Sequence, residues 1–481
     1  MKTKGFKIFI IFLILFVDSF CRAQENVFFT TGIKIGEVTE SSAIIWTRLC
    51  ASEKPNPIKH ERRPAPYRAP KKYNAKMPVS EMDGEVAGTF GEVKIILKSI
   101  GHNLETDWEF VSSLNDYTFN KKIEGLKSNT KYAVELLGRK FRGRAKKGVE
   151  KPLKPSTSIK GSFTTSPSAK DIIPVTFTSS TCQYFWDYDD KERGFKIYDA
   201  MRKLNPLFHC QTGDFVYYDK PGPMALTIEQ ARYKWHAINA WPASVDFYSE
   251  VPLYIQKDDH DLLSNDSYPG MPPFGEITYE DGLDIWYEQV PLKGKPYRTF
   301  RWGKDLQIWL VEGREYRSPN HLPDSPDKTI LGKEQIKWFK ETVEKSNATF
   351  KVLISATPVV GPDREKGKND NHANLAFKTE GDWLRKYLAD NDMQVVIGDR
   401  HWQYVSEDKK TGLKEFSAGP TSDCHAQGWS QDDKRENHKF LRVNGGFISV
   451  KVYRDKNTPI IEFLHHDVDG NIVNKEVIIK K

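Results

Sequence analysis

The sequence predicts an α/β domain that follows a smaller all-β unit, and two observations carry this prediction. From residue 27 to about residue 165, short segments alternate apolar and polar residues, as expected for the strands of a β-sandwich. After a Ser-Pro-Ser-Ala-Lys linker at residues 166–170, apolar strand runs are separated by longer helical segments. We therefore expect a β-sandwich at residues 24–166 and an α/β domain at residues 167–481.

In the N-terminal unit, strands are expected at residues 42–48 and 91–97, and a turn followed by a strand at residues 126–136. The last stretch resembles the corresponding loop and strand of fibronectin type III domains, so the expected sandwich is fibronectin III-like. Residues 54–78 are rich in Pro, Lys and Arg. That composition is typical of a solvated surface insertion.

The first residues of the chain have the pattern of a cleavable signal peptide. Three lysines precede an apolar run at residues 8–17, which is too short to span a bilayer comfortably. We expect cleavage after Ala23, which removes residues 1–23 and makes the protein periplasmic or secreted, without a stable membrane anchor. A lipoprotein anchor at Cys21 is the competing interpretation, but the residues before it form a poor lipobox.

Composition indicates a well-ordered soluble protein. The 481 residues include 12 Trp, 20 Tyr and 27 Phe, and Lys plus Arg exceed Asp plus Glu by 72 to 65, which gives a net charge of +7. The basic residues are spread along the chain, so no nucleic-acid partner is expected. This charge suits a small anionic ester or an anionic oligosaccharide. The four cysteines after the leader, whose spacing is not a disulfide framework, are Cys50, Cys182, Cys210 and Cys424.

In the α/β part, strands are expected at residues 175–178, 306–311, 350–355 and 393–397, and the clearest helix at residues 332–343. In such sheets, functional groups collect in the loops after the carboxyl ends of the strands. Four of these loops contain polar clusters, namely residues 179–183 (Ser-Ser-Thr-Cys-Gln), 212–219 (Thr-Gly-Asp-Phe-Val-Tyr-Tyr-Asp), 257–261 (Lys-Asp-Asp-His-Asp) and 398–402 (Gly-Asp-Arg-His-Trp).

One such cluster alone is more often structural than functional. Four clusters at successive strand ends, however, converge on one rim of a sheet. Converging carboxylates repel each other unless a cation neutralises them. The sequence therefore predicts a bound metal cluster at this rim.

The four clusters resemble, in their order along the chain, the motifs of the PhoD-like (alkaline phosphatase D) family of calcineurin-like metallophosphatases. The motifs are Ser-x-Cys-Gln, Gly-Asp-x-x-Tyr, Asp-Asp-His-Asp with a following Asn, and Gly-Asp-x-His. Residues 313–318 and 331–338 match two further segments of that family. The resemblance covers essentially the whole mature chain. It implies a four-layer α/β/β/α metallophosphatase sandwich behind the N-terminal unit, and a secreted metal-dependent hydrolase of phosphoric mono- or diesters.

The resemblance also implies a cluster of one Fe³⁺ ion and Ca²⁺ ions. Thiolate and phenolate ligands suit Fe³⁺, whereas carboxylate and amide oxygens suit Ca²⁺, and Zn²⁺ or Mn²⁺ could occupy related sites. The implied ligands are Cys182 and Tyr217 for iron, Asp214 as the bridge, Asp259 and Asn265 for the harder cation, and Asp399 and His401 to complete the site.

His260 and Arg314 are candidates for stabilising the phosphoryl oxygens, and His260 also for protonating the leaving group. Arg314 is interpreted equally well as a surface salt-bridge partner. Asp258, Asp261 and Arg400 are expected to orient neighbouring groups without binding metal.

The sequence also departs from the family pattern. Glu312 stands where many relatives have Asp, and Gly313 replaces a Thr. These two departures leave the identity of the substrate open.

Two alternatives to a phosphatase are compatible with the same residues. The metal site could act on an oligosaccharide, as a lyase, a dehydratase or a sulfate-ester hydrolase, because a fold does not fix a function. A non-enzymatic carbohydrate-binding protein with a decayed site is the third class. The intact set of candidate ligands argues against decay, so we expect an enzyme.

Overall fold

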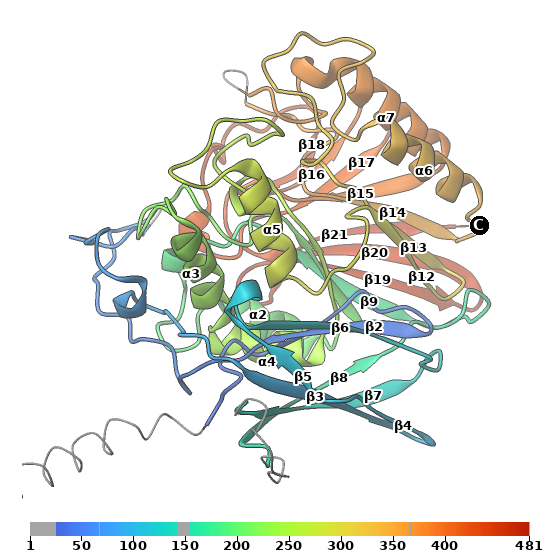
Figure 1. Cartoon of the computed structure of the whole chain (residues 1–481). Helices are drawn as coiled ribbons and strands as arrows, with labels where there is room; N and C mark the ends of the chain where they lie inside the picture. The colour runs from blue at the N-terminus through green and yellow to red at the C-terminus, as the bar shows by residue number, and fades with distance from the viewer. Residues whose placement is uncertain (1–25, 67, 142–153, 365–367, 481) are drawn as a thin grey trace, which may run out of the picture.

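Two large β-sheets face each other at the centre of the molecule, and helices cover their outer faces (Figure 1). The computed structural model describes residues 26–66, 68–141, 154–364 and 368–480. The predicted leader, residues 1–23, lies outside the described residues. Among the residues that are described, no helix combines the length and the apolar character needed to cross a membrane.

The first sheet has nine strands in the order β21-β20-β19-β9-β10-β11-β1-β2-β6. Its centre is parallel, because β10 pairs in parallel with both β9 and β11. The strands are β1 (Ile33–Gly36), β2 (Ser42–Arg48), β6 (Thr118–Glu124), β9 (Val175–Ser180), β10 (Phe208–Thr212), β11 (Leu253–Gln256), β19 (Phe447–Asp455), β20 (Thr458–His466) and β21 (Ile472–Ile479).

The second sheet has seven strands in the order β12-β13-β14-β15-β17-β16-β18, of which β13, β14, β15 and β17 pair in parallel. They are β12 (Arg298–Trp302), β13 (Leu306–Leu310), β14 (Phe350–Ser355), β15 (Met393–Ile397), β16 (Gln403–Glu407), β17 (Lys414–Ala418) and β18 (His438–Arg442).

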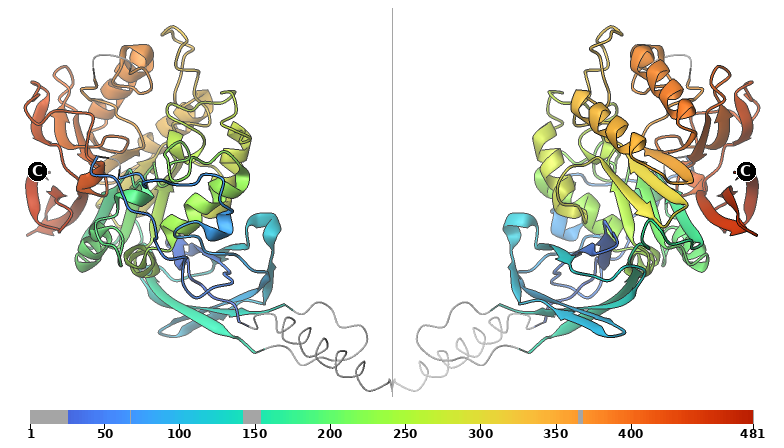
Figure 2. Two further views of the ribbon diagram at one scale, coloured as in Figure 1. Left: turned by 90° about the vertical axis from the view of Figure 1, so that its left-hand side faces the viewer. Right: turned by 90° about the vertical axis from the view of Figure 1, so that its right-hand side faces the viewer.

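Apolar side chains hold the layers together. Residues such as Phe177, Phe208 and Ile354 form a buried core between the two sheets. Helices α2 (Lys196–Lys203), α3 (Ile228–Asn239), α4 (Pro242–Glu250) and α5 (Tyr279–Gln289) pack on the nine-stranded sheet, and α6 (Lys333–Glu344) and α7 (Lys378–Asp390) pack on the seven-stranded sheet (Figures 1 and 2). The layer order is therefore α/β/β/α.

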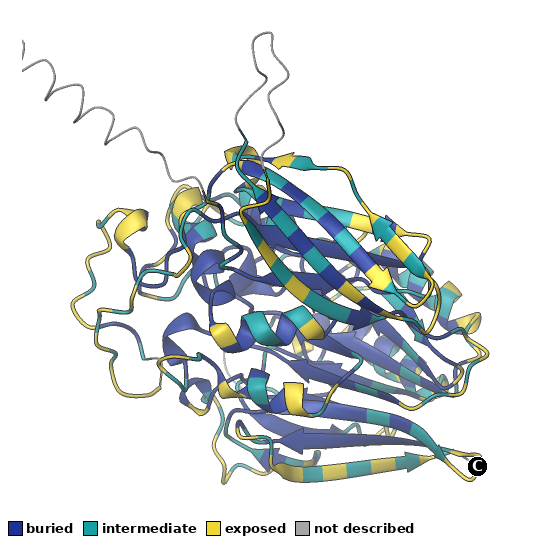
Figure 3. Cartoon of the chain, turned by 90° about the horizontal axis from the view of Figure 1, so that it is seen from below, coloured by how far each residue is buried: buried dark blue, intermediate teal, exposed yellow. Residues whose placement is uncertain are grey.

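A third sheet of five strands lies at the lower end of the molecule, where Figure 2 shows the N-terminal strands in blue to cyan. Buried and less buried residues alternate along its strands, as Figure 3 shows from below, because one face packs on β1, β2 and β6. The strands are β3 (Gly91–Ser99), β4 (His102–Glu105), β5 (Glu109–Val111), β7 (Lys131–Arg139) and β8 (Thr157–Thr164).

The N-terminal residues are not a closed unit, because β1 pairs in parallel with β11, with Gly36 opposite Leu253. One layer of the N-terminal sandwich is thus continuous with the central sheet. The boundary expected at residues 166–167 and the likeness to fibronectin type III domains stay predictions.

The predicted strands and the predicted helix are confirmed, most of them to within one or two residues of their predicted bounds. β2, β14 and β15 have the predicted bounds, β3 and β9 each run two residues further, and α6 begins and ends one residue after the helix expected at residues 332–343. The four cysteines of the described chain are buried and free.

A buried polar network joins the N-terminal strands to the helices of the α/β part. Asp116, which follows the short 3-10 helix η2 (Ser113–Asn115), accepts hydrogen bonds from Arg48 Nε (3.1 Å) and Nη2 (3.0 Å). It also lies 2.6 Å from Nε2 of His236 on α3 and accepts from Gln289 on α5 at 2.8 Å. Burial would raise the pKa of Asp116, but His236 and Arg48 hold that pKa below its usual range.

We expect Asp116→Ala to lower the free energy of unfolding by about 3–5 kcal/mol, because it leaves the Arg48 guanidinium and the His236 imidazole buried without their shared partner. Urea denaturation followed by tryptophan fluorescence measures this loss. The control is Asp327→Ala, which breaks an ion pair with Lys333 in which both side chains are 85% exposed. An exposed pair contributes no more than about 1 kcal/mol, and equal losses in both variants would contradict the role given to the buried network.

Candidate metal centre

The predicted ligands lie at the carboxyl ends of parallel strands from both central sheets. Cys182 follows β9 and Asp214 follows β10, while Asp399 and His401 follow β15 of the facing sheet. The loop after β11 contains the 3-10 helix η4 (Asp259–Asp261). Because the two sheets pack face to face, these four loops meet at one edge of the sandwich.

The backbone turns sharply where each strand ends. Cys182, Asp214 and Asp399 have positive φ angles of 55°, 55° and 61°, a conformation that L-residues rarely adopt and that is concentrated at functional sites. The glycines before the two aspartates allow close contact between loops. A Cβ on Gly213 would approach Asp258 Cβ to 2.5 Å, and one on Gly398 would approach the Thr212 carbonyl oxygen to 2.0 Å.

One group of possible metal ligands surrounds the Asp214 carboxylate. Cys182 Sγ lies 3.4 Å from Asp214 Oδ2, and the Tyr217 hydroxyl donates to the same oxygen at 2.9 Å. Nε2 of His401 lies 3.3 Å from the Tyr217 hydroxyl. Ligand atoms of Cys182, Asp214 and His401 all lie within 4.8 Å of one another. This thiol, phenol, carboxyl and imidazole set fits a transition metal such as Fe³⁺.

A second group shares Asp214. Ligand atoms of Asp214, Asp259 and His260 also lie within 4.8 Å of one another, and all three residues are buried. Asp214 Oδ1 is buried and accepts no hydrogen bond from any of the residues that the structure describes. A cation between these oxygens would satisfy it, so the residues fit a metal site on this side as well. His260 Nδ1 lies 2.7 Å from Asp219, which leaves Nε2 for a ligand or a substrate.

The electrostatics of the protein alone favour bound cations. Burial raises the pKa of Asp214 well above its usual range, and Asp259, Asp261 and Asp399 raise it further. Burial likewise raises the pKa of the Cys182 thiol, so a thiolate there requires a nearby positive charge. Burial lowers the pKa of His401, which keeps this imidazole neutral, the form that binds metals.

Three residues expected to orient their neighbours do contact the candidate ligands or their loops. Asp261 accepts backbone hydrogen bonds from Asp214 (2.8 Å), Val216 (2.9 Å) and Asp258 (2.8 Å), which joins two of the loops. Asp258 pairs with Arg314 through Nε. In the facing sheet, Arg400 is buried between Asp399 and Asp363; its Nη1 lies 3.1 Å from the first and its Nη2 2.8 Å from the second.

Arg314 is not a surface residue, since it is 0% exposed and pairs with Asp258 and, at 3.6 Å, with Asp259. The surface interpretation is therefore wrong. Its guanidinium neutralises these carboxylates, and a contact with substrate stays a prediction. Asn265 is exposed and lines a cavity of about 160 Å³ with His260, Asp399 and His401.

The two departures from the family pattern lie just behind Arg314. Glu312 pairs with buried Lys257 at 2.9 Å and accepts from the Arg314 backbone N–H at 2.6 Å. A Cβ on Gly313 would meet no atom closer than 3.7 Å, so the glycine is not needed to make space.

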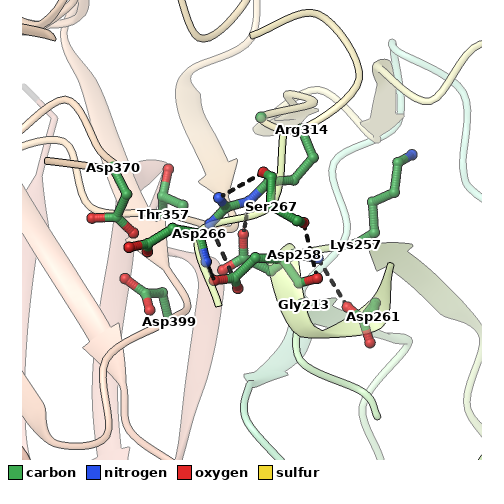
Figure 4. A network of polar contacts seen from close by, with 12 residues as sticks. Gly213, Lys257, Asp258, Asp261, Asp266, Ser267, Arg314, Thr357, Asp370 and Asp399 are labelled. Atoms are coloured by element: carbon green, nitrogen blue, oxygen red, sulfur yellow. Dashed lines mark hydrogen bonds and ion pairs between the residues drawn. The ribbon is translucent and has the colours of Figure 1, made fainter. Parts of the chain in front are cut away.

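The structure adds acidic residues that the sequence did not single out. Figure 4 shows Asp266 and Asp370 beside Asp399. Asp370 is buried, and burial with the nearby Asp370 and Asp259 raises the pKa of Asp266 to about 7. A polar run after β14, Lys-Asn-Asp-Asn-His at residues 368–372, could have indicated Asp370 in the sequence. It was missed because a long loop separates this run from the end of the strand.

A buried histidine also supports the centre. His425 in the 3-10 helix η6 (Asp423–His425) lies 2.9 Å from the Tyr217 hydroxyl through Nε2 and 2.7 Å from Asp187 through Nδ1. A carboxylate that holds an imidazole in this way fixes the orientation of the ring. The sequence did not indicate the contact between His425 and Tyr217, because His425 is a single histidine far from Tyr217 along the chain.

The paired sheets and the mixed thiol, phenol, carboxyl and imidazole set at their edge define a metal-dependent hydrolase of the metallophosphatase type. The chain belongs to the PhoD-like phosphatase family, whose model matches residues 177–446. The resemblance inferred from the motifs is thereby confirmed, as is the expectation of a metal-dependent phosphatase of the alkaline phosphatase D type.

Individual proteins are similar to this chain in sequence or in fold. The chain is 23% identical over 480 residues to alkaline phosphatase D of Bacillus subtilis (strain 168), covering 86% of this chain and 72% of that protein. A solved structure described as "Structure of PhoD" has a similar fold, with a TM-score of 0.69, 16% identity and coverage of 95% and 90% of the two chains. Purple acid phosphatase PPD1 from yellow lupin (Lupinus luteus) seeds has a TM-score of 0.60, 11% identity and coverage of 94% and 74%.

We expect removal of bound metal by a chelator to lower the melting temperature more at pH 8 than at pH 5.5. The pKa values of Asp214, Asp258 and Asp399 are raised in the metal-free fold, mainly by burial, so their contribution to stability falls as pH rises above the unfolded value near 4. Metal binding removes this penalty. Differential scanning calorimetry with and without chelator at both pH values measures the effect, and a larger loss at pH 5.5 would contradict it.

Proposed function

We propose that this protein hydrolyses phosphoric mono- or diesters of small alcohols at a two-metal centre. Supporting this most directly is Asp214, which belongs to both groups of possible ligands. Its carboxylate would be shared by two ions, one held with Cys182, Tyr217 and His401 and the other with Asp259. When bound, the ions supply an activated water and neutralise the charge of the phosphoryl group.

Fe³⁺ for the first position and Ca²⁺ for the second are proposed from the ligand types, with Zn²⁺ or Mn²⁺ as alternatives. Asp399 and Asn265 complete the site in this proposal, since both line the cavity beside His401.

His260 is the proposed proton donor to the leaving oxygen. Burial alone would lower the pKa of His260, but the adjacent carboxylate of Asp219, which holds no metal in this proposal, raises that pKa and favours the protonated ring. Its Nδ1 pairs with Asp219, which orients the ring. Arg314 holds Asp258 and Asp259 in place from behind, and Asp261 fixes the loops that support Asp214.

We also propose that the protein acts in the periplasm or outside the cell, which rests on the leader pattern at residues 1–23. Action on an oligosaccharide stays a prediction without a supporting contact, and the next experiment separates it from ester hydrolysis.

Cys182→Ala and Asp214→Ala are each expected to lower turnover of aryl phosphate mono- and diesters by roughly a hundredfold or more, because each removes a ligand at the centre of the site. Metal analysis of the same samples should show a loss of iron in both variants. The matched control is Cys210→Ala, an equally buried cysteine of β10 in the core between the sheets. Wild-type protein that retains metal but turns over no phosphate ester would sink the proposal and favour the oligosaccharide alternative.

A further inference from the structure

The cavity of about 160 Å³ beside the candidate ligands has a second side that the proposed chemistry does not use. Its volume equals that of about five water molecules at roughly 30 Å³ each. The candidate metal site contributes one side. The opposite side consists largely of cations and hydrogen-bond donors, namely Lys220, Arg364, Lys368, Trp402 and Gln427.

Three of these donors lack an acceptor among the residues that the structure describes. Within the described part of the chain, Nε of Arg364 and Nε2 of Gln427 are buried and donate no hydrogen bond, and the same holds for a third donor, Nε1 of Trp402. The carboxylate next to Arg364 is Asp363, but its closest oxygen lies 3.8 Å from Nε, and its other oxygen pairs with Arg400 at 2.8 Å. A buried donor without an acceptor lowers stability. Oxygen atoms of a ligand would satisfy these donors.

The Arg364 side chain, which is 37% exposed, also contacts an aromatic ring. Its Cζ lies 5.9 Å from the centre of the Trp402 ring, within range of a cation–π contact. A Cβ on Gly428 would come within 3.3 Å of Arg364 Nη1 and 3.4 Å of Trp402 Cζ3, so the absence of a side chain there leaves room for this packing. The planar guanidinium of arginine is itself preorganised, so less conformational entropy is lost for each hydrogen bond that it makes to an anion.

The cations on this side of the cavity differ in how many carboxylates of the described residues lie near them. Lys368 faces acidic residues, since Asp370, Asp399 and Asp266 counter the effect of burial on its pKa and raise that pKa. Among the described residues, the carboxylate that pairs with Arg364 is Asp363, at 3.8 Å. Among the lining residues the carboxylate is Asp399, which is a metal ligand in the proposed function. The donors of this side that lack an acceptor are therefore suited to bind an anion.

We propose that Arg364 and Gln427 bind a second anionic group of the substrate, located on the alcohol part of the phosphate ester. A guanidinium and an amide present planar N–H donors, which match a group with two acceptor oxygens such as a carboxylate. The substrate class is then phosphate esters of small hydroxy acids. This inference rests on the proposed function, because it takes the phosphoryl group to lie at the metal centre.

The test uses two esters of the same size, the phosphates of 3-hydroxypropionate and of 3-hydroxypropionamide. They differ in the charge of the distal group and hardly in the leaving alcohol. We expect kcat/KM of the wild-type protein to be roughly tenfold to hundredfold higher for the carboxylate ester, the range of a hydrogen bond to a charged group. Arg364→Gln should remove most of this preference.

The matched control is Lys191→Gln, which removes one positive charge from an exposed site lining a separate cavity. Lys191→Gln should keep the wild-type preference for the carboxylate ester. If that preference came from a general attraction of anions by the positively charged protein, Arg364→Gln and Lys191→Gln would lower it equally. Equal turnover of the two esters by wild type, or an equal loss on both esters in Arg364→Gln, would overturn the inference. Absence of turnover of any phosphate ester would instead contradict the proposed function.

Discussion

The buried carboxylate of Asp214 imposes the constraint on which the surrounding structure depends. It shares a small volume with other acidic groups, and buried like charges persist only when each has a partner. The loops provide these partners. Arg314 pairs with Asp258 on one side, and Arg400 pairs with Asp399 on the other. The charge that these arginines leave unbalanced around Asp214 is what a metal centre neutralises.

The packing of the two sheets sets the geometry of this centre. Cys182 and Asp214 come from the nine-stranded sheet, and His401 comes from the seven-stranded sheet. Their separation therefore depends on the apolar core between the sheets, where stacked rings such as Phe177 and Phe208 fill the space. Interiors are close-packed and deform little. A large-to-small substitution in that core would thus alter the distance between ligands that it does not touch.

Sequence reasoning selected candidate ligands that follow strands directly, because Cys182, Asp214 and Asp399 come within two residues of a strand end. It missed Asp370 and His425, which reach the site through loops and contacts between residues distant in sequence. Motif order identified the family. It did not reveal the unused donors of the cavity, since a missing hydrogen bond is visible only in three dimensions. For the same reason, the composition of the expected linker could not show that β1 pairs with β11 of the central sheet.

The parallel pairing of β1 with β11 has a consequence for the independence of the two parts of the chain. β11 leads directly into the loop of Asp258 and Asp261, and β1 covers the edge that β11 would otherwise present to solvent. Without its N-terminal residues, the α/β part would carry an open strand edge next to the loop of Asp258 and Asp261, and such an edge recruits strands from other chains. By pairing with β11, the N-terminal strand β1 thus keeps this edge from pairing with another chain.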